Sequence, residues 1–125
     1  LIFDDVFVPW ERVLLYDNPE ALWKLKSDVA SNSLAYHQAI VRLLIKLEFV
    51  TAIACEIAAA IGDDSYLHVQ EKLGELIMQI ETIRALLLSS EREGALDEHK
   101  TYLPNFKYIE TARNLGSKYY PRAIE

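Results

Sequence analysis

Apolar residues cover most of the helical circumference between Leu34 and Ile61, a stretch that contains no Gly or Pro. A helix that is apolar on all sides is either surrounded by other helices or crosses a membrane. Four charged residues argue against the membrane, because a charge at mid-bilayer is costly; they are Arg42, Lys46, Glu48 and Glu56. The pattern therefore predicts the central helix of a helical bundle.

A second long helix is predicted from about Tyr66 to Glu93. Its apolar residues are spaced four and three apart, which forms a heptad-like seam, and they are Val69, Leu73, Leu76, Ile80, Ile83 and Leu87. Gly62 is expected to end the central helix, and Asp64 or Ser65 to cap the second one. Two long apolar helices joined by so short a turn predict an antiparallel pair.

The chain before this pair divides into an extended segment and a short helix. Residues 1–16 are rich in β-branched and aromatic residues and are broken by Pro9, which is typical of an edge or terminal strand. The run Asp17-Asn18-Pro19-Glu20 signals a helix start, and the helix is expected to reach about Asp28. Residues 31–33, Ser-Asn-Ser, mark a weak point before the central helix.

After the pair, the sequence predicts a loop and a third helix. Residues 94–104 contain Gly, Pro and several charges, which is typical of a loop. Asn105 can cap a helix from about Phe106 to Ser117. Pro121 cannot donate a backbone hydrogen bond, so a kink or a new helix is expected near it.

The predicted fold class is all-α, an antiparallel helical bundle over residues 17–125 with an extended segment over residues 1–16. The net charge is −6 and no basic cluster is present, which argues against nucleic acid and anionic membranes as partners. The single cysteine, Cys55, cannot form an internal disulfide, which fits a cytoplasmic protein. The chain begins without Met and ends without a closing signal, so we expect it to be a piece of a longer protein.

Polar residues form a stripe on the central helix. Gln38, Arg42 and Lys46 follow one another at intervals of four residues, which places them on one helix face. His37 lies next to this stripe at the entrance of the apolar stretch. On the residues alone, structural ion pairs and a hydrogen-bonded histidine are favoured over a ligand site, but a buried polar stripe must meet a helix, another subunit or a ligand.

Several blocks resemble the oxygenase component of 4-hydroxyphenylacetate 3-monooxygenases. The longest is Phe3-Asp4-Asp5-Val6-Phe7-Val8-Pro9-Trp10-Glu11-Arg12-Val13. Three more follow in the same order as in that family: Tyr36-His37-Gln38-Ala39 with Arg42, Lys46 and Phe49; residues 69–76; and Tyr119-Tyr120-Pro121-Arg122. The resemblance covers all 125 residues.

The resemblance implies a fold similar to the C-terminal helical domain of acyl-CoA dehydrogenases, with residues 1–16 as the end of a preceding β-domain. It implies an enzyme that hydroxylates 4-hydroxyphenylacetate or a similar phenol ortho to its hydroxyl, using O₂ and reduced FAD from a separate reductase. It also implies a homotetramer built through these helical domains. Sister copies are then expected to cover the part of the central helix that one chain leaves open.

On the same resemblance, this piece contributes one wall of the flavin site and neither a catalytic residue nor a metal ligand. The residues implied to approach the flavin are His37, Gln38, Arg42 and Lys46. An Arg or Lys side chain suits a flavin pyrophosphate as a charged donor.

Two alternatives stay open. The chain can be a purely structural module that forms oligomers. It is also similar to 4-hydroxybutyryl-CoA dehydratases, which hold an iron–sulfur cluster partly through a His that matches His37 and a Cys two turns later. That later position is near Leu44 here, and Cys55 lies too far along the helix, which disfavours the dehydratase.

Overall fold

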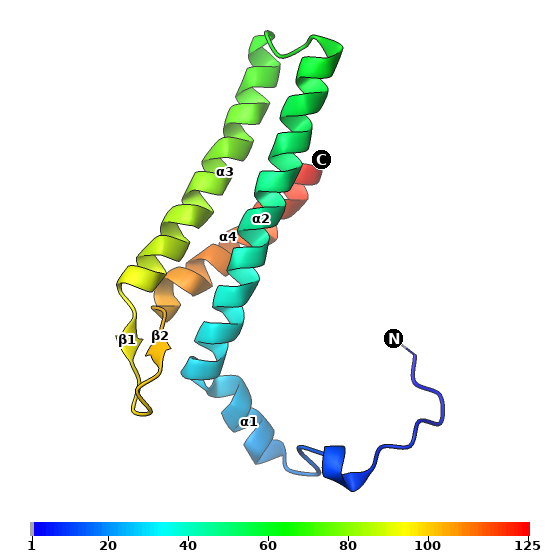
Figure 1. Cartoon of the computed structure of the whole chain (residues 1–125), viewed down its shortest axis with the longest axis vertical. Helices are drawn as coiled ribbons and strands as arrows, with labels where there is room; N and C mark the ends of the chain where they lie inside the picture. Colours follow the sequence, from blue (N-terminus) through cyan, green and yellow to red (C-terminus); the bar gives the residue numbers. More distant parts are fainter. Residues whose placement is uncertain (1) are drawn as a thin grey trace.

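The computed structural model describes residues 2–125, which form a three-helix bundle with an extended arm. Two long helices, α2 (Val29–Ile61) and α3 (Leu67–Arg92), run antiparallel as a hairpin, and α4 (Phe106–Ile124) packs against both (Figure 1). The predicted all-α class and the antiparallel pair are confirmed. None of the helices in this part of the chain has the length and hydropathy needed to cross a bilayer.

The core lies where α2, α3 and α4 meet. It consists of eight buried apolar residues, Ile40, Leu44, Leu47, Ile80, Ile83, Leu87, Ile109 and Ala112. Each buried Leu or Ile stabilises the fold by roughly 1.5–3 kcal/mol relative to an exposed one. Three members of the predicted seam, Ile80, Ile83 and Leu87, lie in this core, while Val69, Leu73 and Leu76 are only partly buried.

Side-chain caps set the start of the first two helices. Asn18 accepts a hydrogen bond from the Ala21 N–H (3.0 Å) and begins α1 (Pro19–Ser27), as predicted. Asp28 accepts from the Ser31 N–H (2.8 Å) and begins α2. The break therefore lies at Asp28 and not at residues 31–33, because Ser33 is buried and donates to the Pro104 carbonyl at 2.6 Å.

Gly62 ends α2 in the left-handed conformation (φ 78°), as predicted, and its N–H bonds back to the carbonyls of the last turn, as is usual for a helix-ending glycine. The predicted cap of α3 by Asp64 or Ser65 is wrong. Tyr66 occupies the N-cap position, and no side-chain cap bond is found there among the described residues. The reason is an extra turn, in which the Tyr66 N–H bonds the Asp63 carbonyl before α3 begins.

The connection between α3 and α4 differs from the predicted loop. It contains two short antiparallel strands, β1 (Ala95–Leu96) and β2 (Tyr102–Leu103). The Asp97 carboxylate accepts a hydrogen bond from the His99 N–H at 2.9 Å and another from the Thr101 N–H at 2.8 Å. Such bonds from an Asp side chain to the backbone just after it close a turn. Charged residues thus form a tight hairpin and not an open loop.

Helix α4 continues through Pro121 to Ile124, so the predicted end near Ser117 and the alternative of a new helix near Pro121 are wrong. Pro121 cannot donate to the carbonyl four residues earlier, but it lies in the last turn and only three helical residues follow it, so little of the helix is affected. Asn105 caps this helix as predicted, through a bond from the Lys107 N–H at 3.0 Å.

Residues 2–16 extend away from the helices, with one 3-10 turn, η1 (Trp10–Arg12) (Figure 1). The extended conformation is confirmed, but the arm forms no strand in the described part of the chain and does not lie over the bundle. Its apolar side chains, including Phe3, Phe7 and Trp10, are exposed.

Candidate functional site

Helix α2 presents three of the four sequence-predicted site residues to solvent. Gln38, Arg42 and Lys46 are all exposed, and their four-residue spacing places them along one side of the helix, as predicted. They begin within the first third of α2 and end near its middle. The stripe is therefore accessible to a ligand or to another chain.

His37 points to a different neighbour. Its Nε2 lies 2.9 Å from a Glu91 carboxylate oxygen on α3, and the hydroxyl of Tyr102 donates to the Glu91 carbonyl at 2.7 Å. His37 and Arg42 are five residues apart, which separates them by roughly 140° around the helix. The structure thus brings Gln38, Arg42 and Lys46 together and turns His37 towards α3.

Helix α4 adds aromatic and cationic side chains to the same region. The Lys46 ammonium lies over the Tyr120 ring, 5.4 Å from its centroid. The Arg113 guanidinium lies over the Tyr36 ring at 4.3 Å, and that ring stacks on Phe106 with centroids 6.0 Å apart. Both contacts are of the kind in which a cation is attracted to the face of an aromatic ring. They join α2 to α4, which points in the same general direction and crosses α2 obliquely (Figure 1).

Arg113 is a candidate site residue that the sequence interpretation missed. It contacts Tyr36, which lies on another helix and far away in the sequence, so no local pattern could reveal the contact. One signal was available, since Arg113 and Tyr120 are seven residues apart and therefore share a helix face.

The charges of this region are not neutralised by carboxylates. The arginines that form ion pairs among residues 2–125 are Arg84, with Glu48 (2.6 Å) and Glu81, and Arg122, with Glu75 (3.2 Å) and Glu125 (3.8 Å). No ion pair found in this part of the chain includes Arg42, Lys46 or Arg113. Unpaired cations on a chain of net charge −6 suit an anionic ligand.

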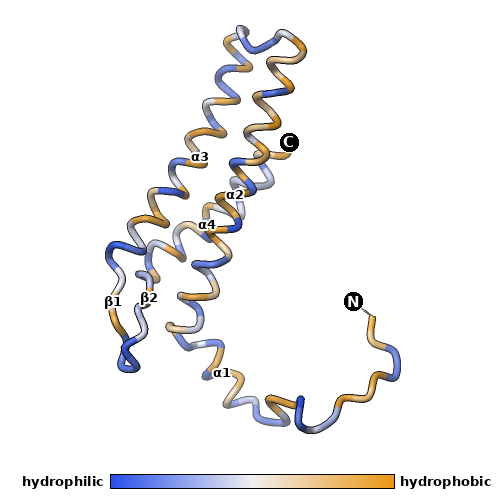
Figure 2. The backbone as a smooth tube through the Cα atoms, in the orientation of Figure 1, coloured by the Kyte–Doolittle hydropathy of each residue, from blue (hydrophilic) through white to orange (hydrophobic). Residues whose placement is uncertain are grey.

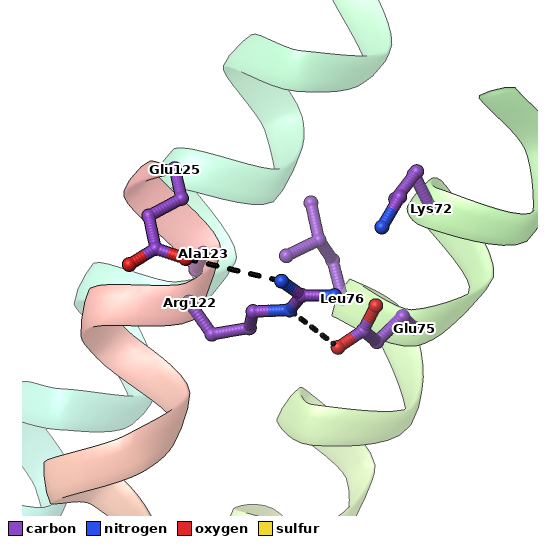
Figure 3. Close-up of a pocket in the computed structure, with 6 residues that line it drawn as sticks. All are labelled: Lys72, Glu75, Leu76, Arg122, Ala123 and Glu125. Atoms are coloured by element: carbon purple, nitrogen blue, oxygen red, sulfur yellow. Dashed lines mark hydrogen bonds and ion pairs between the residues drawn. The ribbon is translucent and has the colours of Figure 1, made fainter.

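A hollow of about 400 Å³ lies between α3 and the end of α4 (Figure 3). Its charged side chains are Lys72, Glu75, Arg122 and Glu125. Figure 3 shows Arg122 reaching both carboxylates, so cations and anions balance within the hollow. This arrangement holds α3 and α4 together and offers no excess charge to a ligand.

The second half of α2 is rich in hydrophobic residues (Figure 2), and several of their side chains are exposed. Exposed apolar side chains at intervals of four residues follow the outer side of α2 from its first half into its second, and they are Val41, Ile45, Phe49, Ile53, Ile57 and Ile61. A shallow groove of about 410 Å³ runs along them, and it is lined by Phe49, Ala52, Ile53, Glu56, Ile57 and Ala60. We call this surface, residues 49–60, the apolar face.

Comparison with known proteins identifies the family. Residues 24–125 match the model of the C-terminal region of 4-hydroxyphenylacetate 3-hydroxylases. The chain belongs to this family. The match covers α2, α3 and α4 entirely. The stripe of Gln38, Arg42 and Lys46 and the apolar face therefore lie within the family's helical domain.

Similar family members come from several bacteria. The chain is 37% identical over its full length to a probable 4-hydroxyphenylacetate 3-monooxygenase of Bacillus subtilis. It is 35% identical, again over its full length, to the 4-hydroxyphenylacetate 3-monooxygenase oxygenase component of Thermus thermophilus. In both cases it spans only 26% of the relative's length.

Solved structures give the same result. A crystal structure of a 4-hydroxyphenylacetate 3-monooxygenase oxygenase component complexed with FAD and 4-hydroxyphenylacetate superposes with a TM-score of 0.86. The sequence identity is 35%, and the match covers 98% of this chain and 26% of that one.

Proposed function

We propose that this chain is the C-terminal helical part of an oxygenase component of a two-component aromatic hydroxylase. The whole protein would hydroxylate 4-hydroxyphenylacetate or a similar phenol ortho to its hydroxyl, with O₂ and reduced FAD supplied by a separate reductase. The observation that carries this proposal is the family match over residues 24–125, together with relatives of that name that align with the entire chain.

The donor set of α2 fits FAD. Arg42 and Lys46 are exposed and unpaired with carboxylates within residues 2–125, as a diphosphate requires of its partners. Gln38 extends the stripe with an amide that can donate or accept. His37 completes the proposed set from the α3 side, where it already contacts Glu91. Bound reduced flavin supplies the electrons that activate O₂, and the residues of this chain supply binding and orientation.

The proposal is tested with the full-length protein. Purified protein is mixed with a flavin reductase, NADH, FAD, O₂ and 4-hydroxyphenylacetate, and the products are identified by mass spectrometry. The expected product is the corresponding catechol, formed only when both FAD and the reductase are present. If no catechol forms from this substrate or from a panel of other phenols, the proposal is wrong.

The chain would also join copies of the protein into a homo-oligomer, and a homotetramer is the state we propose. The apolar face supports this role, because monomers seldom expose a contiguous apolar patch of this kind. A purely structural module would show the same assembly without catechol formation, so the activity experiment separates that alternative from the hydroxylase.

Two further assignments belong to this proposal. Residues 1–16 would be the end of a preceding β-domain, and residues 17–125 the helical domain. The exposed aromatic side chains of the arm support the first assignment, since they have no cover from the bundle. The protein would work in the cytoplasm, where the free thiol of Cys55 is stable.

A further inference from the structure

Five exposed side chains of α2 are arranged symmetrically about Phe49. Arg42 lies seven residues before Phe49 and Glu56 lies seven residues after it. Seven residues make nearly two helical turns, so these three side chains share one face of the helix. Ile45 and Ile53 lie one turn before and one turn after Phe49, and all five side chains are exposed. The face therefore has an apolar centre and two ends of opposite charge.

This face is turned away from the rest of the bundle. Leu47 is buried in the core, and Phe49, two residues later, is turned from it by roughly 200° around the helix. Glu48 binds α3 and Lys46 contacts Tyr120 of α4, so α3 and α4 lie on either side of Phe49 and behind it. Neither helix covers the Phe49 ring, which stays open to another molecule.

The two charges at the ends of this face have no partner of opposite sign in the described chain. None of the ion pairs found among residues 2–125 includes Arg42 or Glu56. The two residues are about 21 Å apart along the helix axis, too far to bind each other within one chain. A second copy of α2 supplies the opposite charge to both.

We propose that two copies of the chain pair α2 against α2 in antiparallel orientation, about a two-fold axis that passes through Phe49. Arg42 of each copy then binds Glu56 of the partner subunit. This inference rests on the homo-oligomer of the proposed function and specifies the residues and the register of one of its contacts.

The order of residues along α2 selects the antiparallel orientation. About a two-fold axis, a residue a given distance before Phe49 lies at the level of the residue equally far after it in the other copy. Arg42 thus meets Glu56 of the partner subunit, and Ile45 lies at the level of Ile53 of the partner subunit. A parallel pair in the same register would set Arg42 against Arg42 and Glu56 against Glu56, and like charges repel.

The other charges near this face also fit the antiparallel pair. Lys46 lies at the level of Ala52 of the partner subunit, and Glu48 at the level of Val50 of the partner subunit, so neither meets a like charge. A guanidinium has five N–H donors. Arg42 therefore keeps donors for a flavin phosphate after it has bound a carboxylate.

The test reverses the charges of the full-length protein one at a time and then together. Arg42→Glu or Glu56→Arg places like charges at both ends of the contact. Each variant is expected to raise the dissociation constant of the assembly at least about tenfold, measured by sedimentation velocity at several concentrations. The double variant, Arg42→Glu with Glu56→Arg, restores opposite charges and is expected to assemble within about threefold of the wild type.

Lys118→Glu is the matched control, since it makes the same charge change at an exposed position of α4 and should assemble like the wild type. Recovery in the double variant reports a contact between copies, because the two residues cannot reach each other in one chain.

A cross-link provides a second measurement that does not depend on the charge variants. Phe49→Cys places a thiol on the two-fold axis next to its own counterpart, so a short bismaleimide is expected to join two copies into a covalent dimer on a denaturing gel. Thr111→Cys, on exposed α4, and the wild type, which keeps Cys55, should give no such dimer.

Three results would overturn the inference. They are a monomeric wild type, a double variant as weakly assembled as the single ones, and single variants that assemble normally while Phe49→Cys gives no cross-link. The last result means that another part of the same chain covers this face. Catechol formation is scored separately: an active enzyme without the charge recovery removes only this contact, whereas recovery without catechol from any phenol removes only the hydroxylase.

Discussion

The two halves of α2 are both apolar, yet they have different surroundings. The first half, residues 29–47, packs against α3 and α4 and contributes Ile40, Leu44 and Leu47 to the core. The second half, residues 48–61, lies beyond the reach of α4, which ends beside the middle of α2 (Figure 1). Its buried residues are Ala58 and Thr51, and the Thr51 hydroxyl has no hydrogen-bond partner within residues 2–125.

This difference shows that one hydrophobic pattern can serve two purposes. Burial within the chain explains Ile40, Leu44 and Leu47 in the first half. In the second half, Phe49 is 66% exposed and Ile57 is 56% exposed, so the same composition has no partner inside the chain. We therefore expect substitutions in the first half to change stability, and substitutions in the second half to change assembly.

The largest effect is expected from a charge on the apolar face. Ile53→Glu would place an unpaired carboxylate in the contact between copies and weaken association by about 3–5 kcal/mol. Sedimentation velocity of the full-length protein at several concentrations measures this shift towards smaller species. Thr111→Glu adds the same charge to an exposed position of α4 and should leave assembly unchanged. A full-size Ile53→Glu assembly would mean that copies meet elsewhere.

The next effect compares equal truncations in the two halves. Leu47 is 1% exposed, so its side chain fills the core. Leu47→Ala should leave a cavity and destabilise the bundle by about 2–5 kcal/mol. Ile57→Ala should cost clearly less in the dissociated protein, because its side chain is open to solvent. Hydrogen–deuterium exchange of α2 peptides, in full-length protein diluted until it is dissociated, reports both values, and equal costs would contradict the distinction between the halves.

A smaller effect is expected where α2 and α4 approach most closely. Gly116 is buried, and a methyl group there would overlap the end of the Leu43 side chain. Gly116→Ala would gain about 1 kcal/mol of helix propensity and lose about 1–3 kcal/mol to overpacking, a net loss of about 1 kcal/mol. Gly74→Ala is the control, since its added methyl has open space, and it should be neutral or stabilising. Thermal unfolding of the wild type, Gly116→Ala and Gly74→Ala measures the order of their stabilities.

The smallest effect concerns pH at the start of α2. Hydrogen bonds from the Ser31 side chain and N–H hold the pKa of Asp28 below its ordinary value of 3.8. A lowered folded-state pKa gives stability that is present above the unfolded value and is lost as the pH falls through the folded one. The first turn of α2 should therefore open more readily below about pH 4.

Asp28→Asn provides the control for this prediction, because Asn still caps a helix but does not titrate. Exchange of the Ser31 amide, compared between wild type and variant at pH 5 and pH 3, should differ only at the lower pH. If the ratio of the Ser31 amide exchange rates of wild type and variant is the same at pH 5 and pH 3, the prediction is wrong.

Local patterns predicted most of the fold. The all-round apolar run, the four-three seam and the caps at Asn18, Gly62 and Asn105 located the starts of α1, α3 and α4 and the end of α2 within a few residues, whereas α2 begins earlier and α4 ends later than predicted. The errors arose where side chains act on nearby backbone. Asp97 closes a hairpin within an expected loop, and Pro121 lies late enough in α4 to be accommodated.

The candidate site was predictable only in part, because its contacts join distant residues. The four-residue spacing placed Gln38, Arg42 and Lys46 on one side. His37 is turned from Gln38 by roughly 100° around the helix. The spacing could not show that this turn brings His37 to Glu91 on α3. Nor could it show that Arg113 of α4 lies over the Tyr36 ring of α2, since that depends on how α4 crosses α2.

The unbroken length of α2 has a mechanical consequence. The helix has 33 residues and no Pro or Gly inside it. At the usual rise per residue it is a stiff strut about 50 Å long. The arm leaves the bundle near the start of α2, and the apolar face lies towards the other end of this helix. The helix thus fixes the spacing between the arm and the apolar face.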